Sequence, residues 1–224
     1  LTGSLSYITT VAAAIVFNPS LDLRDLIICA MITVWALRLG SFLFWRIKKD
    51  GQDKRFIVMK TKFTWFLMTW TIGGLWVLVT MAAGLAALTS NITAELGLIS
   101  YLGIALWLFG FVVEVTADNQ KTEFRKNPDN RNRFITTGVW SWSQHANYFG
   151  EITLWFGLAL VSLPVLSGWQ LATLISPVFV YFLLTKVSGI PLLDRLAKQK
   201  WGTDSDYLSY TQATSKLLLW PPKT

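Results

Sequence analysis

Long apolar runs separated by short polar connections dominate the pattern of hydrophobic and polar positions along the chain. A helix that crosses a bilayer needs roughly 20 apolar residues at about 1.5 Å rise per residue. Five runs reach about this length, and each predicts a membrane-spanning helix. These runs are 26–45, 63–88, 96–115, 148–166 and 169–187.

A sixth apolar run, 4–17, is shorter than the others and begins almost at the first residue. Because Leu1 is not a methionine, we expect an incomplete or trimmed N-terminus, with room for a seventh span in the intact protein. A signal peptide is disfavoured here, since the run lacks leading positive charges and a clear small-residue cleavage site. The whole pattern predicts an all-α polytopic membrane helix bundle of about six spans, forming a single integral membrane domain over 1–224.

Positive charge alternates between the connections of this predicted bundle. The connections 89–95 and 164–168 carry no Lys or Arg, and 18–25 carries only Arg24. Under the positive-inside rule, connections rich in Lys and Arg stay in the cytoplasm. The rule therefore predicts three cytoplasmic segments, namely the connection 46–62, the long loop 116–146 and the tail 188–224.

Composition agrees with this topology. Hydrophobic residues make up 53% of the chain and charged residues 15%, against roughly 25% charged in an average soluble domain. The net charge of +7 follows from the basic connections, so membrane lipids rather than nucleic acid are the expected surroundings. Cys29 has no second cysteine and lies far along the chain from the single His145, so we expect neither an intrachain disulfide nor a transition-metal site.

The loop 116–146 and the tail 188–224 are too long to be mere connections, so we expect function to reside there. Asp118 and Arg125 fall near one face of a helix that continues past the span 96–115, since positions i and i+7 align. Arg133 follows a turn-rich stretch, and guanidinium groups suit phosphates because they donate in pairs. The alternative is that these arginines meet lipid head groups.

Polar residues crowd the end of this loop. Glu151 lies in the span 148–166, where a carboxylate is costly unless it has a partner or meets the positive end of a helix. Asn147 is a candidate N-cap of that helix. We interpret the lone His145 as a hydrogen-bonded structural residue. Arg38 lies inside an apolar run and is a functional candidate for that reason, with snorkelling toward the cytoplasmic face as the alternative.

Three stretches of the loop together resemble the C-terminal domain of the steroid 5α-reductase family, in particular its bacterial branch. They are DNQK from Asp118, N-R-F-x-x-x-G-x-W ending at Trp140, and HANYFGE ending at Glu151. The tail agrees through SGIPLLDR, KWG and Y-L-S-Y-x-x-x-T, which also resemble sterol reductases and isoprenylcysteine methyltransferases more distantly. The resemblance covers most of the chain, from about Leu26 onward.

This resemblance implies an integral membrane reductase, in the bacterial inner membrane, that uses NADPH in a cytosol-facing cavity. The segments 116–151 and 188–214 would form that cavity, without a Rossmann fold because the chain has no G-x-G-x-x-G. Two arginines would pair with phosphates, and two tyrosines would close the cavity unless they form an interfacial belt. The matching cofactor positions are Asp118, Arg125, Arg133, Asn147, Tyr148, Glu151, Asp194, Tyr207 and Tyr210.

The implied reaction is hydride transfer to the β-carbon of an enone in a lipid-like substrate, either steroid-like or polyprenoid. The family's acid is a Glu in an early span working with a Tyr, whereas no Glu precedes Glu95 here. The catalytic proton donor is therefore unassigned, with Tyr101 and Tyr148 as alternatives. An S-adenosylmethionine-dependent membrane methyltransferase is the second hypothesis, although L-L-D-R replaces its usual Glu-Glu pair. A non-catalytic lipid-binding protein is the third.

Overall fold

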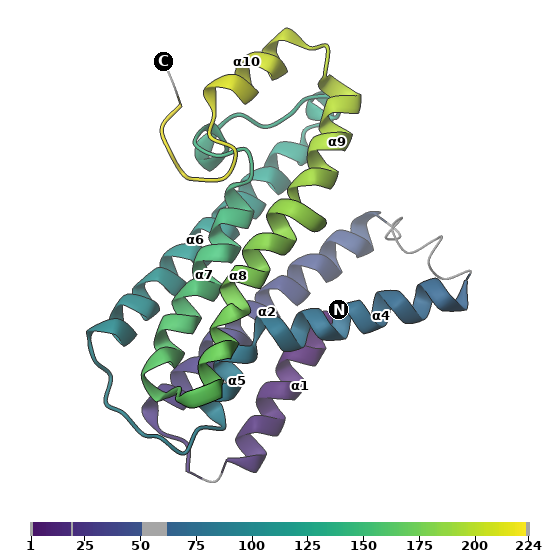
Figure 1. Cartoon of the computed structure of the whole chain (residues 1–224). Coiled ribbons are helices and arrows are strands. Elements are labelled where there is room, and N and C mark those ends of the chain that lie inside the picture. Colours follow the sequence, from purple (N-terminus) through teal and green to yellow (C-terminus); the bar gives the residue numbers. More distant parts are fainter. Residues whose placement is uncertain (1, 19, 51–61, 223–224) are drawn as a thin grey trace. The chain divides into compact units, whose positions relative to one another are not determined.

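The computed structural model describes residues 2–18, 20–50 and 62–222. Helices are the regular elements of these ranges (Figure 1). The α-helices are α1 (Thr2–Phe17), α2 (Leu23–Asp50), α4 (Phe63–Thr80), α5 (Ala82–Leu88), α6 (Leu98–Lys126), α7 (Ala146–Ser162), α8 (Ile175–Phe182), α9 (Ile190–Trp201) and α10 (Ser205–Ala213). Short 3-10 helices η1 (Pro128–Asn130), η2 (Gly138–Ser141), η3 (Leu163–Val165) and η4 (Gly168–Leu174), and the π-helical turn η5 (Leu183–Val187), join them.

Within the described residues, five helical segments are long and apolar enough to cross a membrane. The shorter apolar helix Thr2–Phe17 precedes them. This result confirms the predicted all-α polytopic membrane bundle, and the chain is an integral membrane protein. The five segments are Leu23–Lys48, Phe63–Thr80, Leu98–Lys126, Ala146–Val165 and Gly168–Trp201.

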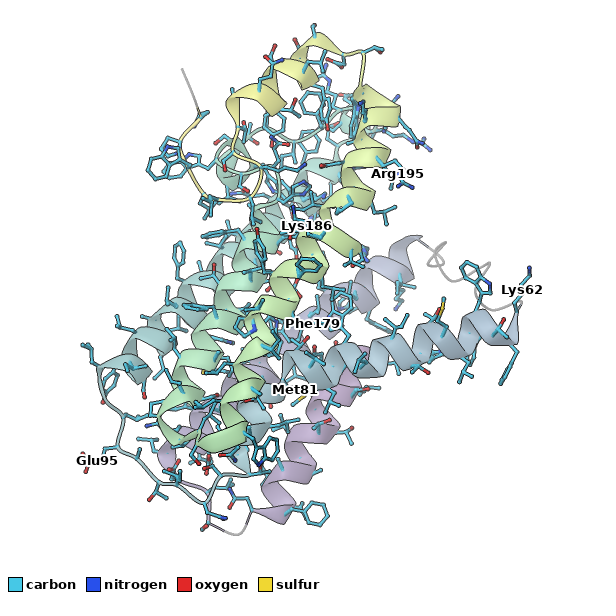
Figure 2. The ribbon with its side chains drawn as sticks, in the orientation of Figure 1. Lys62, Met81, Glu95, Phe179, Lys186 and Arg195 are labelled. Atoms are coloured by element: carbon cyan, nitrogen blue, oxygen red, sulfur yellow. The ribbon has the colours of Figure 1, made fainter. Side chains whose placement is uncertain are left out.

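The sequence predicts one continuous helix over the apolar run 63–88, but this helix is divided at Met81 (Figure 2). Met81 has φ −91° and ψ 4°, outside the helical region. Its backbone still bonds on both sides, to the Val77 carbonyl at 3.1 Å and from the Leu85 N–H at 2.8 Å. The chain therefore changes direction here without leaving unpaired peptide groups, and the Ser176 hydroxyl donates to the Thr80 carbonyl beside the break.

The chain divides into two compact units. Unit 1 comprises Leu1–Gly103 and Leu158–Ser176, and unit 2 comprises Ile104–Gly157 and Pro177–Thr224. In unit 1, the rings of Tyr7 and Trp35 meet edge to face, with centroids 5.1 Å apart.

Unit 1 also contains a buried arginine. Arg24 is 1% exposed. Its Nη1 donates to Ser100 Oγ at 2.7 Å and to the Val161 carbonyl at 2.6 Å. Its Nη2 donates to the carbonyls of Ala94 at 3.1 Å and Glu95 at 2.8 Å. We call these five residues the Arg24 cluster, and it joins the start of α2 to segments far away in the sequence.

In unit 2, glycines bring α6 and α7 together at backbone distance. A Cβ placed on Gly110 would lie 2.6 Å from the Gly150 carbonyl oxygen, and one on Gly150 would lie 2.6 Å from the Gly110 oxygen. Small residues at a helix interface allow this close approach, which is common between membrane helices. The two helices run alongside each other in Figure 1, and this packing holds the polar ends of α6 and α7 close together.

Candidate functional site

The last turns of α6 hold the long loop in place. Trp140 donates from Nε1 to the Ala117 carbonyl at 3.0 Å, and the Val139 N–H donates to Gln120 Oε1 at 3.0 Å. Gly138 has φ +64°, and a Cβ there would collide with the Gln120 side chain. The glycine and the tryptophan of the loop motif therefore both have structural roles. Gly138 permits the turn, and Trp140 fastens the turn to α6.

The tail is in turn bonded to the loop. Ser143 Oγ donates to the Leu217 carbonyl at 2.7 Å. The Gln144 amide donates to the carbonyls of Thr211 at 3.0 Å and Thr214 at 2.7 Å. These bonds join two segments that lie about 70 positions apart in the chain, so the loop and the tail form one polar surface at the end of unit 2.

Three linked side chains lie where the two segments meet, those of His145, Asp194 and Lys216, and we call them the His145 cluster. His145 Nε2 lies 3.1 Å from Asp194 Oδ1, and the other carboxylate oxygen of Asp194 lies 2.5 Å from Lys216 Nζ. Because an ionised carboxylate only accepts hydrogen bonds, Nε2 carries the proton and Nδ1 of the neutral ring is left as an acceptor. Asp194 therefore fixes the tautomer of His145.

His145 is neutral in this environment. Its side chain is almost fully buried. Burial lowers the pKa of His145 below its ordinary value, and the hydrogen bond and charge of Asp194 oppose this effect without cancelling it. The ring also stacks on Tyr148, with centroids 5.8 Å apart and planes inclined by 10°. The interpretation of His145 as a hydrogen-bonded residue agrees with this geometry, but its partner is one of the predicted site residues.

A second polar pair joins α6 to α7. Asn147 Nδ2 donates to Asp118 Oδ1 at 3.4 Å, and the Asp118 side chain is buried. The prediction that Asn147 is the N-cap of the helix over the span 148–166, which is α7, is wrong. The helix begins at Ala146, so Asn147 lies inside its first turn and turns its amide toward α6. Glu151 lies one turn further along α7.

Sequence reasoning missed Glu114, which lies one turn before Asp118 on α6 and is 3% exposed. A signal was available, because Glu114 is a carboxylate inside an apolar run. The same signal identified Arg38 and Glu151 as candidates. Arg38 belongs to unit 1, where its guanidinium lies over the Phe42 ring, 5.2 Å from the centroid.

A cleft of about 400 Å³ opens beside the His145 cluster. Asp194 and Tyr207 are the two predicted site residues that line it, and Arg125 and Arg133 do not. The two arginine side chains are exposed, on the last turn of α6 and on the loop respectively. The lining residues are Gln144, Asp194, Lys198, Gly202, Tyr207, Leu208, Thr211, Thr214 and Lys216.

The two tyrosines of α10 have different surroundings. Tyr210 donates its hydroxyl to the Trp140 carbonyl at 2.6 Å, so it ties the tail to the loop. Burial raises the pKa of Tyr210 far above its usual value. Tyr207 packs edge to face on Phe134 at 5.1 Å, and burial followed by the charge of Asp194 raises its pKa. Both phenols are therefore protonated at neutral pH and available only as neutral groups.

The described residues contain no group of three or more His, Cys, Asp or Glu side chains that could hold a metal ion. The polar chemistry of the site thus rests on the amide and carboxylate pair of Asn147 and Asp118, on the His145 cluster, and on the lysines of the cleft.

Comparisons with known proteins agree with the predicted resemblance. The profile of the DUF1295 family, described as "Protein of unknown function", matches residues 1–214. The cattle (Bos taurus) protein named 3-oxo-5-alpha-steroid 4-dehydrogenase 1 is 34% identical over 70 residues, which is 31% of this chain and 27% of that protein. The human (Homo sapiens) protein of the same name is 36% identical over 64 residues, 29% of this chain and 25% of that protein.

A fungal protein from Ustilaginoidea virens, named "Probable O-methyltransferase ustE", is 29% identical over 137 residues. This match covers 52% of the chain and 48% of that protein. The chain thus spans about a quarter of the length of the steroid relatives and about half of the fungal one. No solved structure matches the chain.

Proposed function

The chain belongs to the DUF1295 family, and from that premise we propose that it is a membrane reductase that binds NADPH at the polar end of unit 2. The substrate we propose is a lipid-like enone, steroid-like or polyprenoid, whose C=C bond is reduced. The similarity to proteins named 3-oxo-5-alpha-steroid 4-dehydrogenase 1 supports this class of reaction. The observation that carries the proposal is the convergence of the loop and the tail on one polar site beside a cleft.

The residues of this end of unit 2 fit a dinucleotide in kind. A cleft of about 400 Å³ lies within the range of roughly 300–1,000 Å³ typical of small-molecule sites. Buried Asp118 and its partner Asn147 supply a carboxylate and an amide, which suit the carboxamide and the hydroxyl groups of a nicotinamide nucleoside. The lysines at the cleft suit phosphates.

When bound, NADPH would supply the hydride. The protein's own groups would orient the cofactor and handle the proton. Asn147 and Asp118 would hold the nicotinamide half, and Glu151 one turn along α7 would extend that set. Asp194 holds His145 Nε2 as a donor, which leaves Nδ1 of the neutral ring as a hydrogen-bond acceptor. Tyr148, stacked on this ring, keeps its orientation.

A methyltransferase remains the second candidate function, because the fungal relative named as a probable O-methyltransferase covers about half of the chain. The two functions require different coenzymes. Purified protein in detergent is titrated with NADPH and with S-adenosylmethionine by calorimetry. We expect NADPH to bind and S-adenosylmethionine not to bind. Binding of S-adenosylmethionine alone would establish the second candidate instead.

The same titration tests the site. Asn147→Ala should weaken NADPH binding by about 1–3 kcal/mol, because a buried carboxylate loses its amide partner and the cofactor loses a hydrogen bond. Gln199→Ala removes an exposed amide from α9 and is the matched control. Equal affinities of both variants for NADPH would show that the nicotinamide half does not contact Asn147. The proposed enone substrate is tested with a 3-oxo-4-ene steroid, whose reduction is measured as the loss of NADPH absorbance.

We also propose that the loop and the tail lie in the cytoplasm of a bacterial cell, where NADPH is available, with the protein in the inner membrane. Single cysteines in a Cys29→Ser background test this orientation. An impermeant maleimide should label Asn91→Cys in intact cells, and it should label Thr203→Cys only after the membrane is opened. The reverse pattern would refute the orientation.

A further inference from the structure

Two tryptophans and one leucine form an exposed apolar patch at the polar end of unit 2. Trp142 in the loop is 47% exposed, and Leu218 and Trp220 in the tail are 60% and 69% exposed. The Trp220 N–H donates to the Trp142 carbonyl at 3.3 Å, and the yellow end of the tail passes beside the teal loop in Figure 1. We call these three residues the tryptophan patch.

The packing of the tail turns the patch outward. Exposure alternates from Leu217 to Trp220, since the first and third residues of this stretch are partly buried and the second and fourth are exposed. Leu219 packs against the buried cluster that contains Trp140. Because Leu219 is held inward, its neighbours Leu218 and Trp220 face away from the protein.

The indole N–H groups separate the tryptophans of this end of unit 2 into two kinds. Trp140 and Trp201 donate from Nε1 to backbone carbonyls, at 3.0 Å and 2.6 Å, and so fasten one segment to another. No described residue accepts a hydrogen bond from Nε1 of Trp142 or of Trp220. An exposed indole with an available donor suits the bilayer interface, where one side is apolar and the other is wet.

The patch lies at the level where spanning helices end. Trp142 stands four residues before the span Ala146–Val165, and four residues of chain reach at most about 14 Å. Two positions before it, Trp140 donates to the carbonyl of Ala117, which lies within the span Leu98–Lys126. The tryptophan patch is therefore beside two membrane-crossing helices, at the boundary between bilayer and water.

We propose that the tryptophan patch is an interfacial anchor, which inserts into the head-group layer of a phospholipid bilayer and holds the end of the tail beside the loop. Lipid is the occupant because the patch lies where the spans end, and because large adjoining apolar side chains are costly to expose to water. Lys216, two residues before Leu218, lines the cleft, so the anchored segment also forms part of the site. The anchor does not depend on which coenzyme binds there.

Spin labelling tests the anchor on the full chain in phosphatidylcholine nanodiscs. A nitroxide on Pro222→Cys, in a Cys29→Ser background, reports the position of the tail end and leaves the patch intact. Its collisions with oxygen, which concentrates in the bilayer, are compared with those with a water-soluble nickel chelate. The ratio of oxygen to nickel collisions should exceed that of a label on Thr203→Cys by at least about twofold, because Thr203 lies in an exposed turn between α9 and α10.

The combined variant Trp142→Gln, Leu218→Gln and Trp220→Gln should lower the ratio at the first label to about that at the second. Trp169→Gln is the matched control, because Trp169 is an exposed tryptophan of unit 1 and its loss should leave the ratio unchanged. Thermal unfolding shows whether each variant is folded. With the patch intact, a ratio at the first label no higher than at the second would overturn the inference, as would a ratio that the combined variant leaves unchanged. Shielding of the first label from both reagents only where two chains share a nanodisc would assign the patch to a second copy and also overturn the inference.

Discussion

The Arg24 cluster of unit 1 and the His145 cluster of unit 2 are both polar, but they differ in how far their hydrogen bonds and charges are satisfied. In the first, each terminal nitrogen of a 1% exposed guanidinium makes two hydrogen bonds, to Ser100 and to three backbone carbonyls. In the second, the Asp194 side chain is 35% exposed and that of Lys216 is 60% exposed. Lys198 beside them has no described partner.

This difference separates structure from binding. A buried polar group must be satisfied within the protein, because water cannot reach it. The two terminal nitrogens of Arg24 meet that requirement, whereas its Nε has no hydrogen-bond partner among the described residues. The four hydrogen bonds of the cluster contribute to stability. The His145 cluster leaves charge and donors facing a cleft, where water or a ligand can satisfy them. We therefore expect mutations in unit 1 to change stability and mutations at the cleft to change binding.

The largest expected effect is that of Arg24→Ala on the free energy of unfolding. Loss of the guanidinium leaves the Ser100 hydroxyl and three carbonyls without their partner, and each unsatisfied buried group costs about 1–3 kcal/mol. We expect at least about 3 kcal/mol of destabilisation, measured by reversible unfolding in mixed micelles. Arg46→Ala on the same helix is the control, since Arg46 is exposed. An equal loss in both variants would show that the cluster has no special role.

Helix positions were predictable from the sequence because the bilayer imposes a minimum length on every apolar run. Five runs coincide with five segments able to span a membrane, and α6 continues to Lys126 as the spacing of Asp118 and Arg125 predicted. The break at Met81 was not predictable. No Pro or Gly stands there, and the bend accompanies tertiary contacts such as the bond from Ser176 to Thr80.

Which side chains meet was predictable only within the stretch 118–151 that the loop motif covers. Asp118 and Asn147 do meet, across 29 positions. The pairing of His145 with Asp194 spans 49 positions, and that of Arg24 with Val161 spans 137. Such distances carry no periodic signal. Arg24 was therefore expected merely as the one basic residue of the connection 18–25, whereas its partners come from three other segments.

The next effect in size concerns pH and the single histidine. Burial lowers the pKa of His145, so the unfolded chain takes up a proton first as the pH falls below about 6.5. Stability is then complete above that pH and decreases below it, by up to about 1.4 kcal/mol per pH unit until the folded pKa is reached. His145→Gln should remove this contribution.

Unfolding free energies at about pH 7.5 and about pH 5.5 measure this dependence for the wild type and for His145→Gln. The difference in slope between the two proteins isolates His145, because the carboxylates titrate in both. Arg24→Ala should keep the wild-type slope, since arginine does not titrate in this range. A slope in His145→Gln as steep as that of the wild type would contradict the assignment of a buried neutral ring.

The smallest effect is expected for Asp194→Asn, and it tests the comparison from the side of the cleft. The variant loses the ion pair with Lys216, which is worth about 0–1 kcal/mol because both side chains are partly exposed. The asparagine oxygen still accepts from His145, but the pKa of His145 should fall further because the carboxylate charge that raises it is gone.

The pKa of the single imidazole is read from its NMR signal in Asp194→Asn and in the wild type, and stability is read from unfolding in mixed micelles. Glu123→Gln breaks the exposed pair with Lys126 and is the control for loss of a surface carboxylate. We expect similar small stability losses in both variants and a lower His145 pKa in Asp194→Asn alone. A loss in Asp194→Asn as large as that in Arg24→Ala would make the His145 cluster a structural element of the same kind as the Arg24 cluster.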